Sequence, residues 1–190
     1  MSQPSYPDAN KLWDGKDNLL CWAAAVSNAL FYTGWANQFN SADEVFALYR
    51  DSFSGKSGTA YIGVKFFLRE ILKTDVSIKD YCKLYPPSGL PFCSQMRGTK
   101  KCGIVGLRND SLQYTHLTAF YDYSTEGSYV ERNDPRQITH LLYSDSDDGE
   151  LSNKIMNVTY NISTKRYDAL NVSTIPYYIY SVMILSPPSA

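Results

Sequence analysis

The amino-acid sequence changes character near residue 100, and this change constrains the fold more than any other feature. Before this point apolar residues recur at helical spacing, and after it they gather in short runs rich in β-branched and aromatic residues. The chain has 190 residues, the usual length of one domain. We therefore expect a single domain over residues 1–190, helical over 1–100 and rich in strands over 101–190.

Three helices are predicted in the first half. The first covers residues 19–32, has Asp17 or Asn18 as its N-cap, and carries alanines that suit a tightly packed central position. The second begins at Ser41, which forms a capping-box pattern with Glu44. The third covers residues 60–72.

Five apolar runs in the second half predict strands. They are residues 102–107, 117–123, 138–143, 154–162 and 177–185. Helices followed by strands favour an α+β fold in which a central helix packs on a mainly antiparallel sheet. The last run is apolar enough to lie inside the sheet.

Charge and hydropathy exclude several partner classes. The 18 basic and 19 acidic side chains give a net charge of −1, so we expect no binding to nucleic acid. No apolar run approaches the roughly 20 residues of a membrane helix, so we expect no membrane partner. Residues 1–7 lack the charged and apolar regions of a signal peptide.

Cys21 is the candidate nucleophile. It lies in the first turn of the predicted alanine-rich helix, where free N–H groups and the helix dipole stabilise a thiolate. The alternative is a buried structural cysteine. The other three cysteines, Cys82, Cys93 and Cys102, show no CxxC spacing and allow at most one disulfide, so we expect no metal site among them.

A thiolate–imidazolium pair requires a histidine, and the chain has two. His116 begins an apolar run and is therefore predicted at the start of a strand, from where it can reach a helix N-terminus. His140 lies inside another run, which is more typical of a structural or solvent-facing residue. We favour His116 on this geometry.

An orienting carboxylate for His116 is available in the cluster 144–149. Asp145 is the natural candidate, because it follows the run 138–143. Two alternatives are a solvated acidic turn and a calcium loop. The positions of Gly149 and Glu150 do not fit an EF-hand. Upstream of Cys21, Lys11 and Lys16 offer a cation for an oxyanion.

Three segments together resemble the Mac/IdeS-type immunoglobulin-degrading cysteine endopeptidases. Residues 11–21 and the alanines that follow are similar to the family's Lys…Gly-Lys-Asp-Asp-Leu-Leu-Cys-Gly-Ala-Ala block. Residues 103–107 and 116–121 are similar to its Gly-Leu strand and its His-Val-Ile-Asn-Leu-Trp strand, and residues 142–147 match Tyr-Val-Thr-Asp-Ser-Asp. Trp22 stands where the family has Gly, and either narrows the cleft or restores the Cys-Trp-Ala succession of papain.

The resemblance implies a papain-like fold and a cysteine endopeptidase with a Cys-His-Asp triad. Cys21 would be the nucleophile, His116 the general base and acid, and Asp145 its orienting residue. Asp147 would be a supporting carboxylate and Lys11 the oxyanion donor. No cofactor or metal is implied. The implied partner is a protein substrate such as immunoglobulin, cleaved by a monomeric virulence enzyme that is secreted or delivered to a host.

Two other functional classes remain open at this stage. The same triad serves an amidase, deamidase or transglutaminase, because only the acceptor and the pocket decide the product. A relative that binds immunoglobulin without cleaving it is the alternative from the class of binding proteins.

Overall fold

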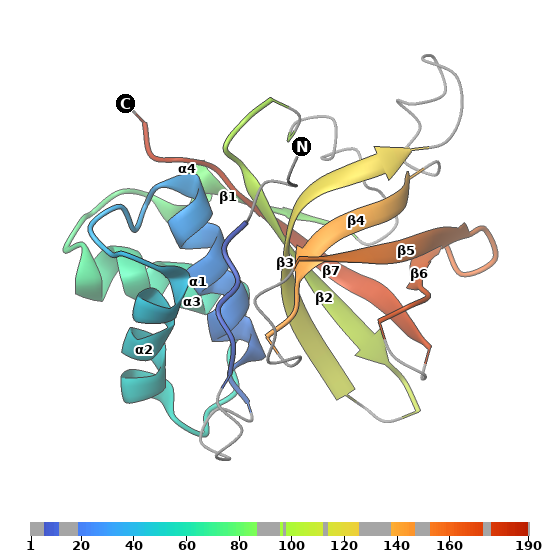
Figure 1. Ribbon diagram of the computed structural model, residues 1–190, viewed down its shortest axis with the longest axis horizontal. Helices are drawn as coiled ribbons and strands as arrows, with labels where there is room; N and C mark the ends of the chain where they lie inside the picture. The colour runs from blue at the N-terminus through green and yellow to red at the C-terminus, as the bar shows by residue number, and fades with distance from the viewer. Residues whose placement is uncertain are drawn as a thin grey trace.

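The computed structural model describes residues 6–11, 19–86, 96, 98–111, 114–125, 138–146, 153–172 and 176–189. Within these residues the helices form one side of the molecule and most of the strands form the other, as Figure 1 shows. The N-terminal segment, residues 6–11, runs between the two sides. In the described residues, one short strand, Cys82–Tyr85, precedes residue 100, and the other strands follow residue 101.

The helical side contains four α-helices in the described part of the chain. They are α1 (Cys21–Thr33), α2 (Ala42–Phe53), α3 (Ala60–Phe66) and α4 (Ile78–Tyr81), and α3 continues as the π-helical turn Phe67–Ile71. The predicted capping box is present, because the Ser41 hydroxyl accepts a hydrogen bond from the Glu44 N–H at 3.2 Å. The predicted cap of α1 is wrong: Leu20 occupies the N-cap position and makes no side-chain cap.

Seven strands in the described residues form one antiparallel sheet. They are β1 (Cys82–Tyr85), β2 (Cys102–Asn109), β3 (Tyr114–Thr125), β4 (Ile138–Ser144), β5 (Lys154–Asn161), β6 (Arg166–Ala169) and β7 (Tyr177–Leu185). The spatial order is β1-β7-β2-β3-β4-β5-β6. All five predicted strands are present, and β7 lies inside the sheet as expected.

The expected papain-like α+β fold, a helix packed on a sheet, is wrong, because strands β2 to β7 close into a six-stranded antiparallel barrel. Closure is made by β6, which pairs with β5 on one edge and with β7 on the other. In the latter pairing Asp168 lies opposite Tyr178, and Ala169 lies opposite Tyr177. This strand could not be predicted from the sequence, because its four residues, Arg-Tyr-Asp-Ala, contain no apolar run.

Two apolar cores explain the strand pattern. One fills the barrel, as expected for a barrel of this size, and includes Val105, Phe120 and Val182. The other lies between the barrel wall and the helices, where Ile104 and Met183 pack with the alanines of α1. Strands β2 and β7 are buried on both faces, and they therefore read as continuous apolar runs.

Gly103 shows how closely the barrel interior is packed. A Cβ atom at this position would lie 1.9 Å from Cε1 of Phe120, which is opposite Gly103 in the β2–β3 pairing. The Phe120 side chain therefore occupies the space that any other residue at position 103 would need.

Candidate active site

Cys21 is the first residue of α1, and its side chain is partly exposed. The alanines that follow it are buried at the interface with the barrel and allow the helix to approach β2 and β3 closely. Because the N–H groups of a first helical turn have no partner within the helix, the sulfur lies in a position that favours negative charge.

The side chains of His116 and Asp145 are in direct contact. His116 lies on β3 and is 5% exposed, and Asp145 follows the last residue of β4 and is 9% exposed. The Nε2 atom of His116 lies 2.9 Å from Oδ1 of Asp145, a hydrogen-bond distance. Since Nε2 faces Asp145, the other ring nitrogen, Nδ1, is available to the thiol.

The thiol of Cys21 lies next to His116, and the two side chains shift each other's pKa. Burial raises the pKa of Cys21, but the His116 hydrogen bond and charge, the N–H of Leu117 and the charge of Lys11 together lower it below its ordinary value. Burial by itself would lower the pKa of His116. The interactions with Asp145 and Cys21 outweigh this effect of burial and raise the pKa of His116 to about 10. Both shifts favour a thiolate–imidazolium pair.

Lys11 joins the same site from the N-terminal segment. Its backbone N–H donates to the carbonyl of Ser146 at 3.0 Å, directly after Asp145. The structure thus brings together four of the five predicted residues: Cys21, His116, Asp145 and Lys11. The fifth, Asp147, and the alternative cation Lys16 lie outside the described residues.

The other described cysteines differ from Cys21 in their chemistry. Cys82 and Cys102 are free thiols that are buried, and burial raises the pKa of Cys82 to about 12 and that of Cys102 well above its ordinary value. They are therefore inert compared with Cys21. Cys93 lies outside the described residues.

Trp22 does not narrow the site, because its side chain is 1% exposed and points into the helical side. The indole packs edge-on against Tyr49 and Phe53, and its Nε1–H donates to the Lys56 carbonyl at 3.3 Å. A Cβ atom on Gly58 would lie 2.6 Å from the same ring. Trp22 therefore supports the segment that precedes α3.

An apolar pocket of about 290 Å³ is lined in part by Leu117, the neighbour of His116 in the chain, and sequence reasoning missed it. Its lining includes Gly58, which packs on Trp22, and Leu117, whose N–H contacts the Cys21 sulfur. Ala60, Ile104, Val182 and Met183 also contribute to its walls. These residues come from four separate elements and a loop, so no local sequence pattern predicts the pocket.

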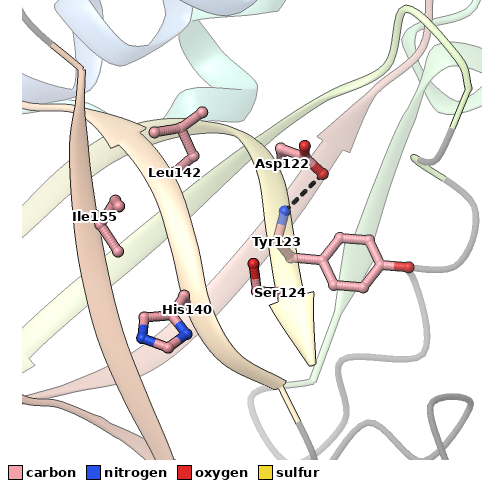
Figure 2. Close-up of a pocket in the computed structure, with 6 residues that line it drawn as sticks. All are labelled: Asp122, Tyr123, Ser124, His140, Leu142 and Ile155. Carbon is pink, nitrogen blue, oxygen red and sulfur yellow. Dashed lines mark hydrogen bonds between the residues drawn. The ribbon is translucent and has the colours of Figure 1, made fainter. Parts of the chain in front are cut away.

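His140 belongs to a different part of the surface. It lines a cavity of about 380 Å³ with Asp122, Ser124, Leu142 and Ile155, on strands β3, β4 and β5 (Figure 2). His140 precedes Ser144, the neighbour of Asp145, by four strand residues. It therefore lies about 13 Å from this end of the candidate site. Its Nδ1 atom lies 2.7 Å from the Thr139 hydroxyl. The preference for His116 over His140 agrees with this placement.

The described residues contain no group of three His, Cys, Asp or Glu side chains arranged to hold a metal ion. The part of the acidic cluster 144–149 that follows Ser146 lies outside the described residues. In the same described part of the chain, none of the helices has the length and apolar character needed to cross a membrane.

No protein-family model and no curated protein matches this chain. The chemistry of the site must therefore be argued from its own geometry.

Proposed function

We propose that this protein is a cysteine endopeptidase whose catalytic triad is Cys21, His116 and Asp145. The observation that carries the proposal is a buried imidazole, bonded to a buried carboxylate, next to a thiol whose pKa it lowers. This arrangement is the general signature of an activated nucleophile. The proposal depends on these side chains and not on the fold.

The first half of the reaction forms an acyl-enzyme. The Cys21 thiolate attacks the carbonyl carbon of a peptide bond, and the carbonyl oxygen becomes an oxyanion. The Cys21 N–H and the Lys11 ammonium stabilise this oxyanion. The His116 imidazolium then donates its proton to the departing amine as the C–N bond breaks, which leaves a thioester on Cys21.

The second half hydrolyses the thioester. Neutral His116 removes a proton from water, the hydroxide attacks the thioester carbonyl, and the carboxylic acid product leaves as the thiolate is restored. Asp145 holds the imidazole in orientation and stabilises its charged form throughout. The overall reaction consumes only the peptide and water.

The substrate is proposed to be a protein, with immunoglobulin as the first candidate because of the resemblance to the Mac/IdeS-type endopeptidases. The apolar pocket lined by Leu117, the residue that follows His116, supports recognition of an apolar side chain of the substrate. On this proposal the enzyme acts as a monomer and is secreted or delivered to a host.

The test is incubation of the purified protein with immunoglobulins and unrelated proteins under reducing conditions, with a Cys21→Ala variant in parallel. Intact-mass analysis should show discrete fragments with the wild type and none with Cys21→Ala. Ammonia release without chain cleavage would instead identify an amidase or deamidase, and stoichiometric binding without fragments would identify a binding protein.

A further inference from the structure

The N-terminal segment, residues 6–11, is held on both sides by hydrogen bonds. On the helical side, the Ala9 N–H donates to Oδ1 of Asn28 at 2.7 Å, and the Asn10 N–H donates to Oδ1 of Asp43 at 3.3 Å. The bond to Asn28 is buried, and Asn28 is 1% exposed. A buried amide of this kind gives the segment a defined position relative to α1.

On the barrel side, the contacts of the segment flank Asp145. The Pro7 carbonyl accepts hydrogen bonds from the Ser144 hydroxyl at 2.8 Å and from the Tyr121 hydroxyl. The Lys11 N–H donates to the Ser146 carbonyl. The segment is therefore bonded both to the helix that carries Cys21 and to the chain on either side of Asp145.

This arrangement makes the location of Lys11 depend on Asn28. Asn28 follows Cys21 by two helical turns on α1, and Ala9 precedes Lys11 by two residues. We propose that Asn28 is a positioning residue: by holding the Ala9 N–H, it places the Lys11 ammonium beside the Cys21 sulfur. Its catalytic importance rests on the proposed function, but the position of the charge can be measured without turnover.

The experiment compares alkylation of Cys21 in the full chain by iodoacetate, an anion, and by iodoacetamide, which is neutral. Both reagents attack thiolates, so the ratio of their rate constants reports the positive charge near the sulfur and is insensitive to overall reactivity. Lys11→Met should lower this ratio about fivefold at low salt, because two neighbouring unit charges of opposite sign attract by about 1 kcal/mol in water.

Asn28→Ala should lower the iodoacetate-to-iodoacetamide ratio in the same direction as Lys11→Met. The double variant Lys11→Met/Asn28→Ala should lower it no further than Lys11→Met alone. Ser27→Ala is the matched control, because Ser27 is also fully buried on α1 but bonds only to the Ala23 carbonyl of its own helix. Its ratio should equal that of the wild type.

A wild-type ratio in folded Asn28→Ala, or independent effects in the double variant, would overturn the assignment. If Asn28→Ala does not fold, Ser144→Ala loosens the segment from its barrel side and should lower the ratio in the same way. An unchanged ratio in that variant counts equally against the proposal. A failure of the proposed protease function would look different, because protein cleavage would be absent while the pattern of ratios persisted.

Discussion

His116 on β3 and Asp145 beyond the end of β4 are separated by 29 positions in the chain, and their side chains meet at 2.9 Å. β3 and β4 are neighbours in the barrel, and their pairing ends at Ala119 and Ser144. Continued in the same direction beyond Ser144, the chain therefore passes the part of β3 that carries His116. Burial lowers the pKa of the His116 imidazole. The hydrogen bond to Asp145 is the largest of the interactions that raise this pKa.

Asp145→Asn tests this relationship directly. The amide keeps the shape of the side chain but removes its charge, so the imidazolium loses its stabilising partner. We expect kcat for protein cleavage to fall roughly 10³- to 10⁴-fold, as in other triads that lose this charge. Asp110→Asn, at an exposed carboxylate that pairs with Arg108, is the control and should keep normal turnover. A normal kcat in Asp145→Asn would remove Asp145 from the triad.

The pH dependence of Cys21 alkylation follows from the two opposite pKa shifts. The lowered pKa of Cys21 means that the thiolate persists at pH values where an ordinary thiol is protonated. The raised pKa of His116, about 10, means that the imidazolium persists up to that pH. Iodoacetamide should therefore label Cys21 rapidly below pH 9, where an ordinary thiol is protonated, as followed by peptide mass analysis.

Two controls belong to this measurement. His116→Ala should move the midpoint of Cys21 labelling upward, because the imidazole no longer stabilises the thiolate. Cys82 and Cys102 should remain unlabelled in the folded protein over the same range, since burial raises the pKa of both thiols. A midpoint for Cys21 at or above 9 in the wild type would contradict the thiolate–imidazolium pair.

The candidate site could be predicted from the sequence to the extent that each residue has a local signature. Cys21 is recognisable because it opens an alanine-rich helix, and His116 because it begins an apolar strand run. The apolar pocket could not be found in this way, since Gly58, Ile104 and Met183 converge only through tertiary packing. The hydrogen bond from the Ala9 N–H to Asn28 likewise could not be predicted from the local sequence.

The fold was predictable element by element but not in its closure. The five apolar runs correspond to β2, β3, β4, β5 and β7, because a strand buried on at least one face must carry apolar residues. β6 is the exception: only Tyr167 and Ala169 are buried in it, and its pairing with β5 and β7 depends on backbone hydrogen bonds. These four residues distinguish a closed barrel from the sheet that the sequence predicts.

Gly103→Ala tests the packing inside the barrel. The new methyl group would overlap the Phe120 ring, so we expect a loss of stability of about 1–3 kcal/mol or more, measured by urea denaturation. The double variant Gly103→Ala/Phe120→Leu removes most of the ring and should recover part of this loss relative to Phe120→Leu alone. Strict additivity of the two changes would show that position 103 does not face Phe120.

Ala60→Leu tests whether the apolar pocket binds substrate. Ala60 lines the pocket at the start of α3 and is 7% exposed, so a larger side chain there fills space that a substrate side chain would occupy. We expect kcat/KM for substrates with a large apolar side chain to fall about 10- to 200-fold, the range for misfit in an apolar pocket. The rate of Cys21 alkylation by iodoacetamide should stay normal, because the triad does not contain Ala60. Equal losses for substrates with large and small side chains would mean that the pocket plays no part in selecting them.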